Sequence, residues 1–350
     1  MVTEDTSWLI TGGCGFIGTA LIKHLLEHGL AGRIRVLDNL SVGSRKDLER
    51  VCQFTEARPK KIGTGPAFSV STPERPAGAL SDKSVELVPG DIRDTDTTIA
   101  CCQDIDIVVH LAANTGVPKS VENPRLDMEC NVMGTFNMLE AARHHGIKRF
   151  VFASSGAPAG EVTPPIHEEL PPHPVSPYGA SKLAGEGYCS AYFRTFGIET
   201  VALRFSNVYG PGSSHKTSVV AKFIKRALAG QPLEIYGDGT QTRDFIYIDD
   251  LIDALILAAT KNGIGGETFQ IATSRETTLD ELTTILLDVL ERSGVRRPQV
   301  KKTEPRLGDV KRNFSDTTKA RRMLGWKCRW DLEKGLEKTV DWFLRKEGYN

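Results

Sequence analysis

The stretch "ITGGCGFIG" (residues 10–18) places four glycines in nine residues close to the N-terminus. Because a glycine inside a regular element costs about 0.5–1 kcal/mol relative to alanine, the stretch must need backbone without side chains. An apolar run leads into it and a helical pattern begins at about Phe16, which predicts a strand, a tight turn and a helix. The glycines fit GxxGxxG (Gly12, Gly15, Gly18) or GxGxxG (Gly13, Gly15, Gly18). With either spacing, a pyrophosphate can reach the backbone N–H groups at the helix N-terminus.

An acidic residue ends the next apolar run, "RVLDNL" (35–40), and this Asp38 lies 20 residues after Gly18. A carboxylate there accepts hydrogen bonds from the adenosine ribose and repels a 2′-phosphate. The glycines alone could form only a tight turn. Together with Asp38 they predict dinucleotide binding, with NAD favoured over NADP.

The composition argues against several classes of protein. Basic and acidic residues number 44 each, whereas a nucleic-acid-binding surface has a basic excess. No apolar run approaches the roughly 18 residues of a membrane span, and the start "MVTEDTSW" is unlike a secretory signal. The seven cysteines are odd in number and include no CxxC, so we expect free thiols, a cytoplasmic protein and no metal site.

Apolar runs alternate with helical patterns along the first 205 residues. The runs are apolar nearly throughout, which is typical of parallel strands covered on both faces. The alternation predicts an α/β fold with a doubly wound parallel sheet of the Rossmann type. We expect strands at 7–11, 33–37, 85–89, 106–112, 149–154 and 200–205, and helices at 16–29, 125–145 and 178–196.

After about residue 205 the pattern loosens, and we expect two domains. Residues 1–205, with 246–262 returning to them, form the NAD-binding domain, and 206–350 form mainly a smaller C-terminal α/β lobe for substrate. Residues 53–82 are rich in Pro, Gly, Ser and Lys, which indicates an exposed insertion. Residues 158–177 hold seven of the 18 prolines, where a binding loop could lie. The later helices are expected near 217–229, 249–261, 278–293 and 332–346.

A second motif, "SPYGASK" (176–182), holds Tyr178 and Lys182. Their spacing of four puts both side chains on one face of a helix. A tyrosine is a poor base at its ordinary pKa of about 10, and we expect the nearby ammonium to lower that pKa. Ser154 and Ser155 end a strand, where doubly wound folds place their chemistry. By itself the pair could be a surface helix pair, but with the glycines and Asp38 it predicts catalysis.

At this point the chain resembles the extended short-chain dehydrogenase/reductases, in particular the NAD-dependent nucleotide-sugar epimerases and dehydratases, along nearly its whole length. Besides the glycine motif and YxxxK, the matching stretches are "DNLSVG" (38–43), "GDIRD" (90–94), "HLAA" (110–113), "NVMGT" (131–135), "LRFSNVYGPG" (203–212), "GDGTQTRDFIYIDD" (237–250) and "RLGD" (306–309). The resemblance implies an enzyme, most similar to the UDP-hexose 4-epimerases. It also implies a homodimer formed through helices near 125–145 and 178–196.

The resemblance further implies roles for individual residues. Ser155, Tyr178 and Lys182 would be catalytic, and Lys182 would also reach the nicotinamide ribose. Asp91 and Ile92 would flank the adenine, and Asn131 would support the active site. The other cofactor contacts would be Gly12, Gly15, Phe16, Ile17, Gly18, Asp38, Asn39, Leu111, Ala112 and Ala113. The substrate contacts would be Ser155, Gly156, Asn207, Val219, Tyr236, Arg243, Arg306, Asp309 and Asn313. Two arginines suit a diphosphate, which they can bind with paired N–H donors.

Family members share a first step, in which the tyrosine takes the proton of a sugar hydroxyl and NAD accepts the hydride of C4. The 4,6-dehydratases that the chain resembles carry Asp-Glu directly after the catalytic Ser/Thr, as acid and base for elimination. Here Gly156 and Ala157 follow Ser155, and neither side chain transfers a proton. The sequence therefore predicts 4-epimerisation of a UDP-sugar. A dehydratase or a net dehydrogenase/reductase is the alternative, and a non-catalytic NAD sensor is a remote one.

The sequence leaves the sugar open among glucose, N-acetylglucosamine and glucuronic acid. Where the family usually has Val-Tyr-Gly, this chain has Pro158-Ala159-Gly160, and we expect the missing tyrosine to leave room in the pocket. The position equivalent to a pocket-wall tyrosine of plain-hexose epimerases is Asn313, a smaller residue. His215 and Lys216 could meet a uronate carboxylate, although we favour a solvated loop.

Overall fold

The computed structural model of the chain describes residues 3–58, 84–305 and 310–347. Its contacts divide the chain into two compact units. The first unit comprises Met1–Gly160, Pro171–Arg204 and Leu255–Phe269. The second comprises Glu161–Leu170, Phe205–Ala254 and Gln270–Asn350.

A sheet whose described part has eight strands dominates the first unit, in the order β12-β7-β6-β5-β1-β2-β4-β3. The pairs β1–β2, β1–β5, β2–β4, β3–β4 and β5–β6 are all parallel. The chain runs outward from β1 through β2, then returns to place β5 on the other side of β1. Ligands of doubly wound folds bind at such a switch point, outside the carboxyl ends of the strands. The strands are β1 (Ser7–Thr11), β2 (Arg33–Asp38), β3 (Thr55–Glu56), β4 (Ser84–Pro89), β5 (Ile107–His110), β6 (Arg149–Ser155), β7 (Glu199–Phe205) and β12 (Glu267–Ile271).

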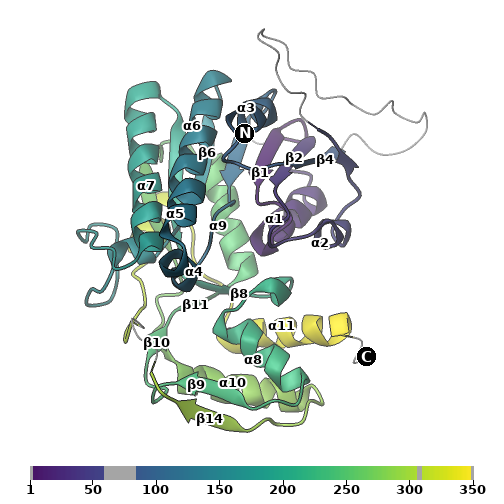
Figure 1. Cartoon of the computed structure of the whole chain (residues 1–350), viewed down its shortest axis with the longest axis vertical. Helices are drawn as coiled ribbons and strands as arrows, with labels where there is room; N and C mark the ends of the chain where they lie inside the picture. Colours follow the sequence, from purple (N-terminus) through teal and green to yellow (C-terminus); the bar gives the residue numbers. More distant parts are fainter. Residues whose placement is uncertain (1–2, 59–83, 306–309, 348–350) are drawn as a thin grey trace. The chain divides into compact units, whose positions relative to one another are not determined.

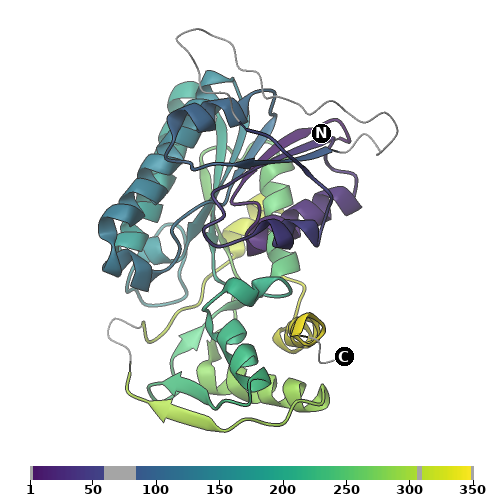
Figure 2. The same cartoon turned by 45° about the vertical axis from the view of Figure 1, so that its right-hand side comes forward.

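Helices connect these strands, and Figures 1 and 2 show α6 and α7 running side by side. The expected helix 125–145 is confirmed as a helical segment, but it is composite: α5 and α6 flank a π-helical turn, η1. Turns of this kind are rare and occur often at functional sites. The helices are α1 (Phe16–Glu27), α2 (Arg45–Glu49), α3 (Thr95–Cys102), α4 (Val117–Glu122), α5 (Pro124–Met128), η1 (Glu129–Met133), α6 (Gly134–His144) and α7 (Pro177–Phe196).

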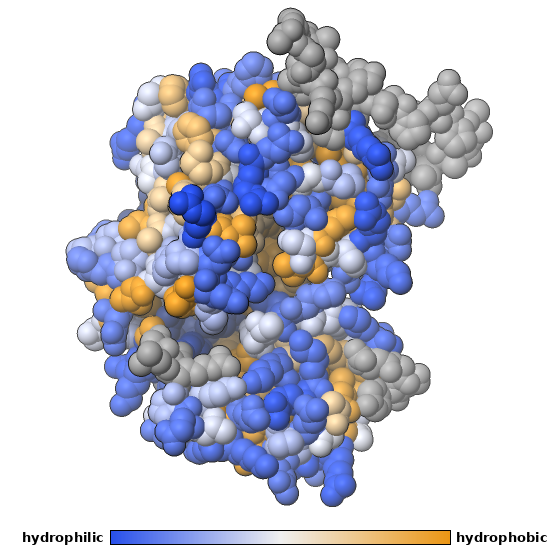
Figure 3. Space-filling view, in the orientation of Figure 1, coloured by the Kyte–Doolittle hydropathy of each residue, from blue (hydrophilic) through white to orange (hydrophobic). Residues whose placement is uncertain are grey.

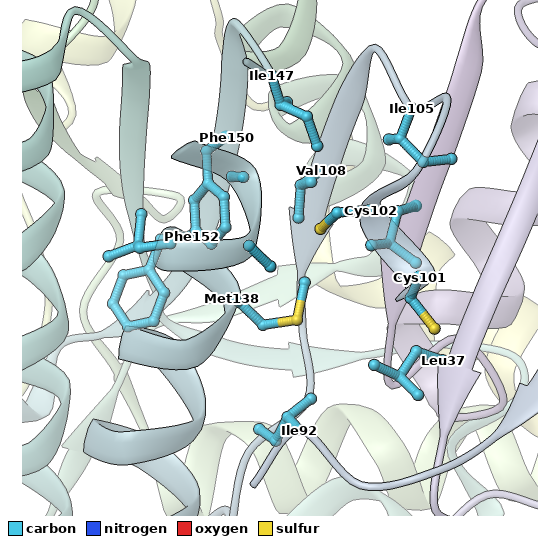
Figure 4. Packing of buried hydrophobic residues seen from close by; sticks show 14 of the residues in the cluster. Leu37, Ile92, Cys101, Cys102, Ile105, Val108, Met138, Ile147, Phe150 and Phe152 are labelled. Carbon is cyan, nitrogen blue, oxygen red and sulfur yellow. The ribbon is translucent and has the colours of Figure 1, made fainter. Parts of the chain in front are cut away.

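The core of the first unit lies between the sheet and these helices. Figure 4 shows Met138 of α6 beside Val108 of β5 and the rings of Phe150 and Phe152 of β6, and all four are fully buried. Helix α7 packs close to the same strand, because a Cβ on Gly185 would lie 2.4 Å from the Phe152 ring. The apolar strands thus bury one face under α6 and α7, as their composition predicts.

The second unit is built from helices and short strand pairs. Helix α9 (Ile248–Thr260) contains one boundary between the units. The pairs β8–β11 and β9–β14 are parallel and β10–β13 is antiparallel. The elements are β8 (Asn207–Tyr209), α8 (Val219–Leu228), β9 (Leu233–Tyr236), β10 (Thr242–Arg243), β11 (Phe245–Tyr247), β13 (Thr277–Thr278), α10 (Leu279–Arg292), β14 (Val300–Thr303) and α11 (Leu332–Glu347). No helix of the described residues has the length and apolarity needed to cross a bilayer.

Candidate active site

The glycine turn joins β1 to α1 at the switch point of the sheet. Gly12 has a φ of +70°, and a Cβ there would lie 2.9 Å from the Ala112 nitrogen. A Cβ on Gly18 would lie 2.5 Å from the Gly13 Cα. Both glycines are therefore required by packing of backbone on backbone, in addition to the expected approach of a pyrophosphate. Gly15 is the N-cap of α1 and provides no side-chain cap, which leaves this helix end suited to a phosphate.

Asp38 ends β2 beside the glycine turn and is 7% exposed. Its Oδ2 accepts the Cys14 N–H at 2.9 Å and its Oδ1 accepts the Leu40 N–H at 2.8 Å. Burial raises the pKa of Asp38, and these two N–H groups oppose that rise. The carboxylate therefore holds the turn together, and because each of its oxygens can accept a second hydrogen bond, it can also accept from a ribose.

Polar side chains gather near the ends of β2 and β4, around the residues predicted to flank the adenine, Asp91 and Ile92. Asn39 Nδ2 donates to Asp91 Oδ2 at 3.0 Å, and Arg93 donates to both Asp91 oxygens. The side-chain hydrogen bond from Arg93 is the main cause that lowers the pKa of Asp91 to about 2. Ile92 is buried beside Gly134. A Cβ added to Gly134 would lie 2.5 Å from the Ile92 side chain. Arg93 was not among the expected site residues, although its place in "GDIRD" was a signal for it.

Helix α7 presents the Tyr-Lys pair from its first two turns. Ser176 caps the helix by accepting the Gly179 N–H at 3.1 Å, and Pro177 occupies the first helical position. A Cβ on Gly179 would lie 2.7 Å from the Ala157 carbonyl oxygen. Only glycine there allows the start of α7 to approach the turn that follows β6, and this brings Tyr178 to Ser155.

Tyr178 is the predicted base, and its environment differs from the expectation. Burial raises the pKa of Tyr178 to about 12, opposed by a side-chain hydrogen bond with Ser155, while the charge of Asp127 raises it further. The expectation that Lys182 lowers this pKa is therefore wrong for the chain alone. The Lys182 Nζ lies 5.9 Å from the centre of the tyrosine ring and donates instead to the Ala153 carbonyl at 2.8 Å.

Lys182 is itself buried, with 3% of its surface exposed. Burial lowers the pKa of Lys182 to about 8, and the carboxylates of Asp127 and Glu186 oppose that shift. Its Nζ also lies 5.0 Å from the centre of the Phe152 ring. The ammonium is thus fixed by a carbonyl on β6 and by an aromatic face, in a position set by the sheet.

Asn131 lies in the π-helical turn η1 and is 1% exposed. Its Oδ1 accepts the Asn114 N–H at 2.8 Å, which fixes the orientation of the amide. Its Nδ2 lies within hydrogen-bond distance of the Asn114 carbonyl, of Asp127 Oδ1 and of Ser181 Oγ, at 2.9, 2.9 and 3.1 Å. Asn131 therefore joins η1 to the helix that carries Tyr178 and Lys182.

A chain of buried hydrogen bonds runs from β1 to Asn131 through His110. Thr135 Oγ1 donates to the Asn131 carbonyl at 2.7 Å, so the His110 Nε2–H must donate to Thr135 at 3.1 Å. The His110 Nδ1 then accepts from Thr11 Oγ1 at 2.8 Å. Burial lowers the pKa of His110 to about 3, so the ring is the neutral Nε2–H tautomer. This series of hydrogen bonds was not expected, because it joins residues far apart in the sequence.

The turn after β6 carries the residues that were expected to distinguish the reactions. Ser155 Oγ accepts the Ala157 N–H at 3.2 Å, and a Cβ on Gly156 would have no heavy atom within 4 Å. Ala159 is 1% exposed, so the expectation that the missing tyrosine leaves open room at this residue is wrong. Other atoms of the chain cover that position.

In the second unit, residues 242–244 bring together three of the predicted substrate contacts. Asn207 donates to the Asp244 carbonyl through its backbone N–H and its Nδ2, at 3.0 and 3.2 Å. The Asn313 N–H donates to Thr242 Oγ1 at 3.3 Å. Arg243 lies between these contacts, and its Nη1 donates to two backbone carbonyls at 2.6 and 2.7 Å. Arg306 and Asp309 lie outside the described residues.

Two further substrate candidates lie at α8 and β9. Tyr236 ends β9, with the Lys222 Nζ 4.9 Å from its ring centre, and Val219 begins the helix that carries Lys222. The Lys216 Nζ donates to the Val208 carbonyl at 3.4 Å and the residue is half-buried, so its ammonium does not extend from a solvated loop as we favoured. Burial lowers the pKa of Lys216 to about 8. His215 is exposed.

Comparison with known proteins agrees with this geometry. Residues 8–272 match the NAD dependent epimerase/dehydratase family. The chain belongs to this family. It is 35% identical to a UDP-glucose 4-epimerase of Mycolicibacterium smegmatis over 97% of this chain and 98% of that protein. It is 32% identical to a dTDP-glucose 4,6-dehydratase of Streptomyces antibioticus over 96% and 91%. The structure of a Thermotoga maritima UDP-glucose 4-epimerase with UDP-glucose superposes with a TM-score of 0.82 at 33% identity, covering 98% of this chain and 100% of that one.

Membership of the epimerase/dehydratase family identifies NAD as the cofactor and confirms the doubly wound Rossmann fold. The residues at the switch point fit this cofactor. Gly12 and Gly18 allow a tight turn, the N-terminus of α1 has no side-chain cap at Gly15, and Asp38 provides carboxylate oxygens at the end of β2. The relatives include both epimerases and dehydratases, and the chain's own residues must distinguish these reactions.

Proposed function

We propose that the chain is an NAD-dependent UDP-sugar 4-epimerase, which inverts C4 through a transient 4-keto sugar. The observation that supports epimerisation is the pair that follows Ser155. Gly156 and Ala157 have no proton-transferring group where the 4,6-dehydratases that the chain resembles carry Asp-Glu. Without that acid and base, the chain lacks the groups that usually transfer protons when water is eliminated from C5 and C6.

The proposed chemistry begins at Ser155 and Tyr178, whose hydroxyl groups interact and together orient the C4 hydroxyl. NAD, held by the glycine turn and Asp38, would supply the acceptor for the hydride of C4 and the donor that returns it. The phenolate of Tyr178 takes the hydroxyl proton and later gives it back. Lys182 contributes a fixed ammonium on the same face of α7, held by the Ala153 carbonyl.

In the second unit, the proposed role of Arg243, Asn207 and Tyr236 is to bind the UDP part of the substrate. A guanidinium suits a diphosphate because it donates paired hydrogen bonds. A tyrosine ring held by a cation, as Tyr236 is by Lys222, offers a face on which a base can stack.

The competing proposal is a nucleotide-sugar 4,6-dehydratase, favoured by the 32% identity to the Streptomyces antibioticus protein. The deciding experiment incubates the chain and NAD with UDP-glucose, UDP-N-acetylglucosamine and UDP-glucuronate in D2O, with products resolved by NMR. Epimerisation gives C4-inverted product without deuterium at C5 and without accumulation of NADH. Deuterium at C5 or loss of the C6 oxygen establishes a dehydratase, and steady growth of NADH absorbance establishes a net dehydrogenase. No product and no NADH with any sugar overturns the assignment.

A further inference from the structure

A buried carboxylate beside the catalytic helix has no part in the chemistry described above. Asp127 lies in α5 and is 1% exposed. Its Oδ1 is within hydrogen-bond distance of Asn131 Nδ2, at 2.9 Å, while its Oδ2 is buried without a hydrogen-bond partner in the described chain. A buried carboxylate that lacks hydrogen bonds is costly unless a positive charge compensates it.

The compensating charge is the ammonium of Lys182. Burial raises the pKa of Asp127, and the Ser181 hydroxyl and the Lys182 ammonium oppose that rise. In turn, the Asp127 carboxylate opposes the lowering of the Lys182 pKa by burial. The negative charge of Asp127 also raises the pKa of Tyr178 of α7 and of Cys130 of η1, and the Ser181 hydroxyl lies close to Asp127. The charge of Asp127 thus acts on both members of the Tyr-Lys pair.

The other groups around Lys182 do not supply this charge. On its own helix, Glu186 is matched by the Arg204 guanidinium, which donates to both carboxylate oxygens at 2.8 Å, and by the Ser154 hydroxyl. His110 of β5 is neutral, and burial raises the pKa of Cys189, so its thiol is neutral as well. Among the described groups that face Lys182, Asp127 is therefore the carboxylate that no other cation matches.

We propose that Asp127 is a positioning residue of the reaction: its carboxylate compensates the buried Lys182 ammonium and, through Asn131 and Ser181, fixes the first turn of α7. The path is continuous, since Asn131 Nδ2 lies 3.1 Å from Ser181 Oγ, which donates to the Tyr178 carbonyl at 3.1 Å. This inference rests on the proposed roles of Tyr178 and Lys182.

The negative charge of Asp127 determines the direction in which this residue shifts the pH dependence of the reaction rate. A nearby carboxylate favours the protonated form of both Tyr178 and Lys182. Activity requires a phenolate that can form and an ammonium that persists. Removing the carboxylate makes both groups lose their protons at lower pH, so the acidic and the alkaline limbs of the rate profile both move toward lower pH.

The test is Asp127→Asn, which keeps the size and an acceptor oxygen for Asn131 but removes the charge. We expect both limbs of kcat/KM to move toward lower pH by about one pH unit, the low end of the shifts that a nearby unit charge produces. Asp127→Glu, which restores the charge, should return them toward the wild-type positions. The matched control is Glu129→Gln, two residues further along in η1, a partly exposed carboxylate near Arg93 and Arg125, which should leave the profile unchanged.

A second measurement needs no turnover. Tyrosine ionisation is followed by ultraviolet difference titration in Asp127→Asn and in the wild type, each corrected by its Tyr178→Phe counterpart, and Tyr178 should ionise at lower pH in the variant. If Asp127→Asn does not fold, Asp127→Ser provides the same comparison. Unmoved limbs and an unmoved titration, with or without a lower kcat, overturn the inference. A chain inactive on every sugar but with a shifted titration overturns the proposed function and its positioning role, and leaves only the electrostatic effect of Asp127 on Tyr178.

Discussion

At the scale of single residues, the phenol oxygen of Tyr178 is the group on which the proposed chemistry depends. Tyr178→Phe keeps the ring in its place on α7 and removes the proton-transferring atom. We expect kcat to fall at least about 100-fold, the usual contribution of a general acid–base group. Folding and NAD binding should be retained, as checked by circular dichroism and by titration with NAD. Near-normal turnover would contradict the proposed role.

Asp38 has two functions that a matched pair of variants separates. Its carboxylate accepts the N–H groups of Cys14 and Leu40, and its charge is expected to repel a 2′-phosphate. Asp38→Asn keeps the size and one acceptor oxygen, so it should weaken the discrimination against NADP with little loss of stability. Asp38→Ala should also lower the free energy of unfolding, because it leaves both N–H groups without their partner. Calorimetric affinities for NAD and NADP test this, and a wild type that prefers NADP would refute the ribose assignment.

Asn313 is the residue expected to set the size of the sugar. It lies beside Thr242, which directly precedes Arg243 in the second unit. Asn313→Tyr adds an aromatic ring and should reduce kcat/KM for UDP-N-acetylglucosamine about tenfold more than for UDP-glucose, since the ring would occupy space needed by the N-acetyl group. The two substrates are assayed in parallel. Equal losses on both would show that this residue does not line the sugar pocket.

At the scale of elements, the position of α7 on the sheet decides where Tyr178 and Lys182 lie. Gly185 faces the Phe152 ring at a distance too short for a Cβ, whereas a Cβ on Gly187 of the same helix would meet nothing within 4 Å. We expect Gly185→Ala to lower the free energy of unfolding by about 1–3 kcal/mol through overpacking. Gly187→Ala should leave it unchanged or raise it by up to about 1 kcal/mol, because alanine favours helix. Urea denaturation measures both, and equal effects would contradict this packing.

Local sequence patterns predict some of the strands and helices of this chain and miss others. The strands at 7–11, 33–37, 85–89 and 149–154 and the helices at 16–29 and 178–196 are confirmed within one or two residues at each end, because apolar runs and caps determine them locally. Strand β12, at the edge of the sheet, and helices α2, α3 and α4 were not expected. These elements are short, and the periodicity of so few residues does not separate them from loops.

At the scale of the whole molecule, we propose that the chain is a homodimer. Of the nine exposed large apolar residues in the described chain, six lie on helices α4, α5, η1 and α7 of the first unit. Figure 3 shows apolar side chains among polar ones on its helical side. The six exposed apolar residues on these helices are Val117, Val121, Met128, Met133, Tyr188 and Phe196. Such a patch marks a protein–protein contact more often than a free surface.

The test is the mass in solution, measured by light scattering after gel filtration. The wild type should be a dimer, and the double variant Met133→Glu/Tyr188→Glu should be a monomer, because two buried carboxylates would lack partners in the interface. Val300→Glu, on β14 of the second unit, changes an equally exposed apolar residue and should remain dimeric. A monomeric wild type, or a double variant that stays dimeric, would refute this proposal.

The sequence by itself determined the features that depend on neighbours along the chain. The glycine turn, the acidic end of the next strand and the Tyr-Lys spacing are local patterns, and together they indicated a Rossmann fold that binds NAD. Only the tertiary structure determined the protonation states of the site residues. The pKa of Tyr178 rises because burial removes water from its phenolate, and Asp127 acts on it from another helix 51 residues away in the sequence. The neutral state of His110 likewise depends on Thr11 and Thr135, since burial and hydrogen-bond partners are set by the folded chain and not by the order of its residues.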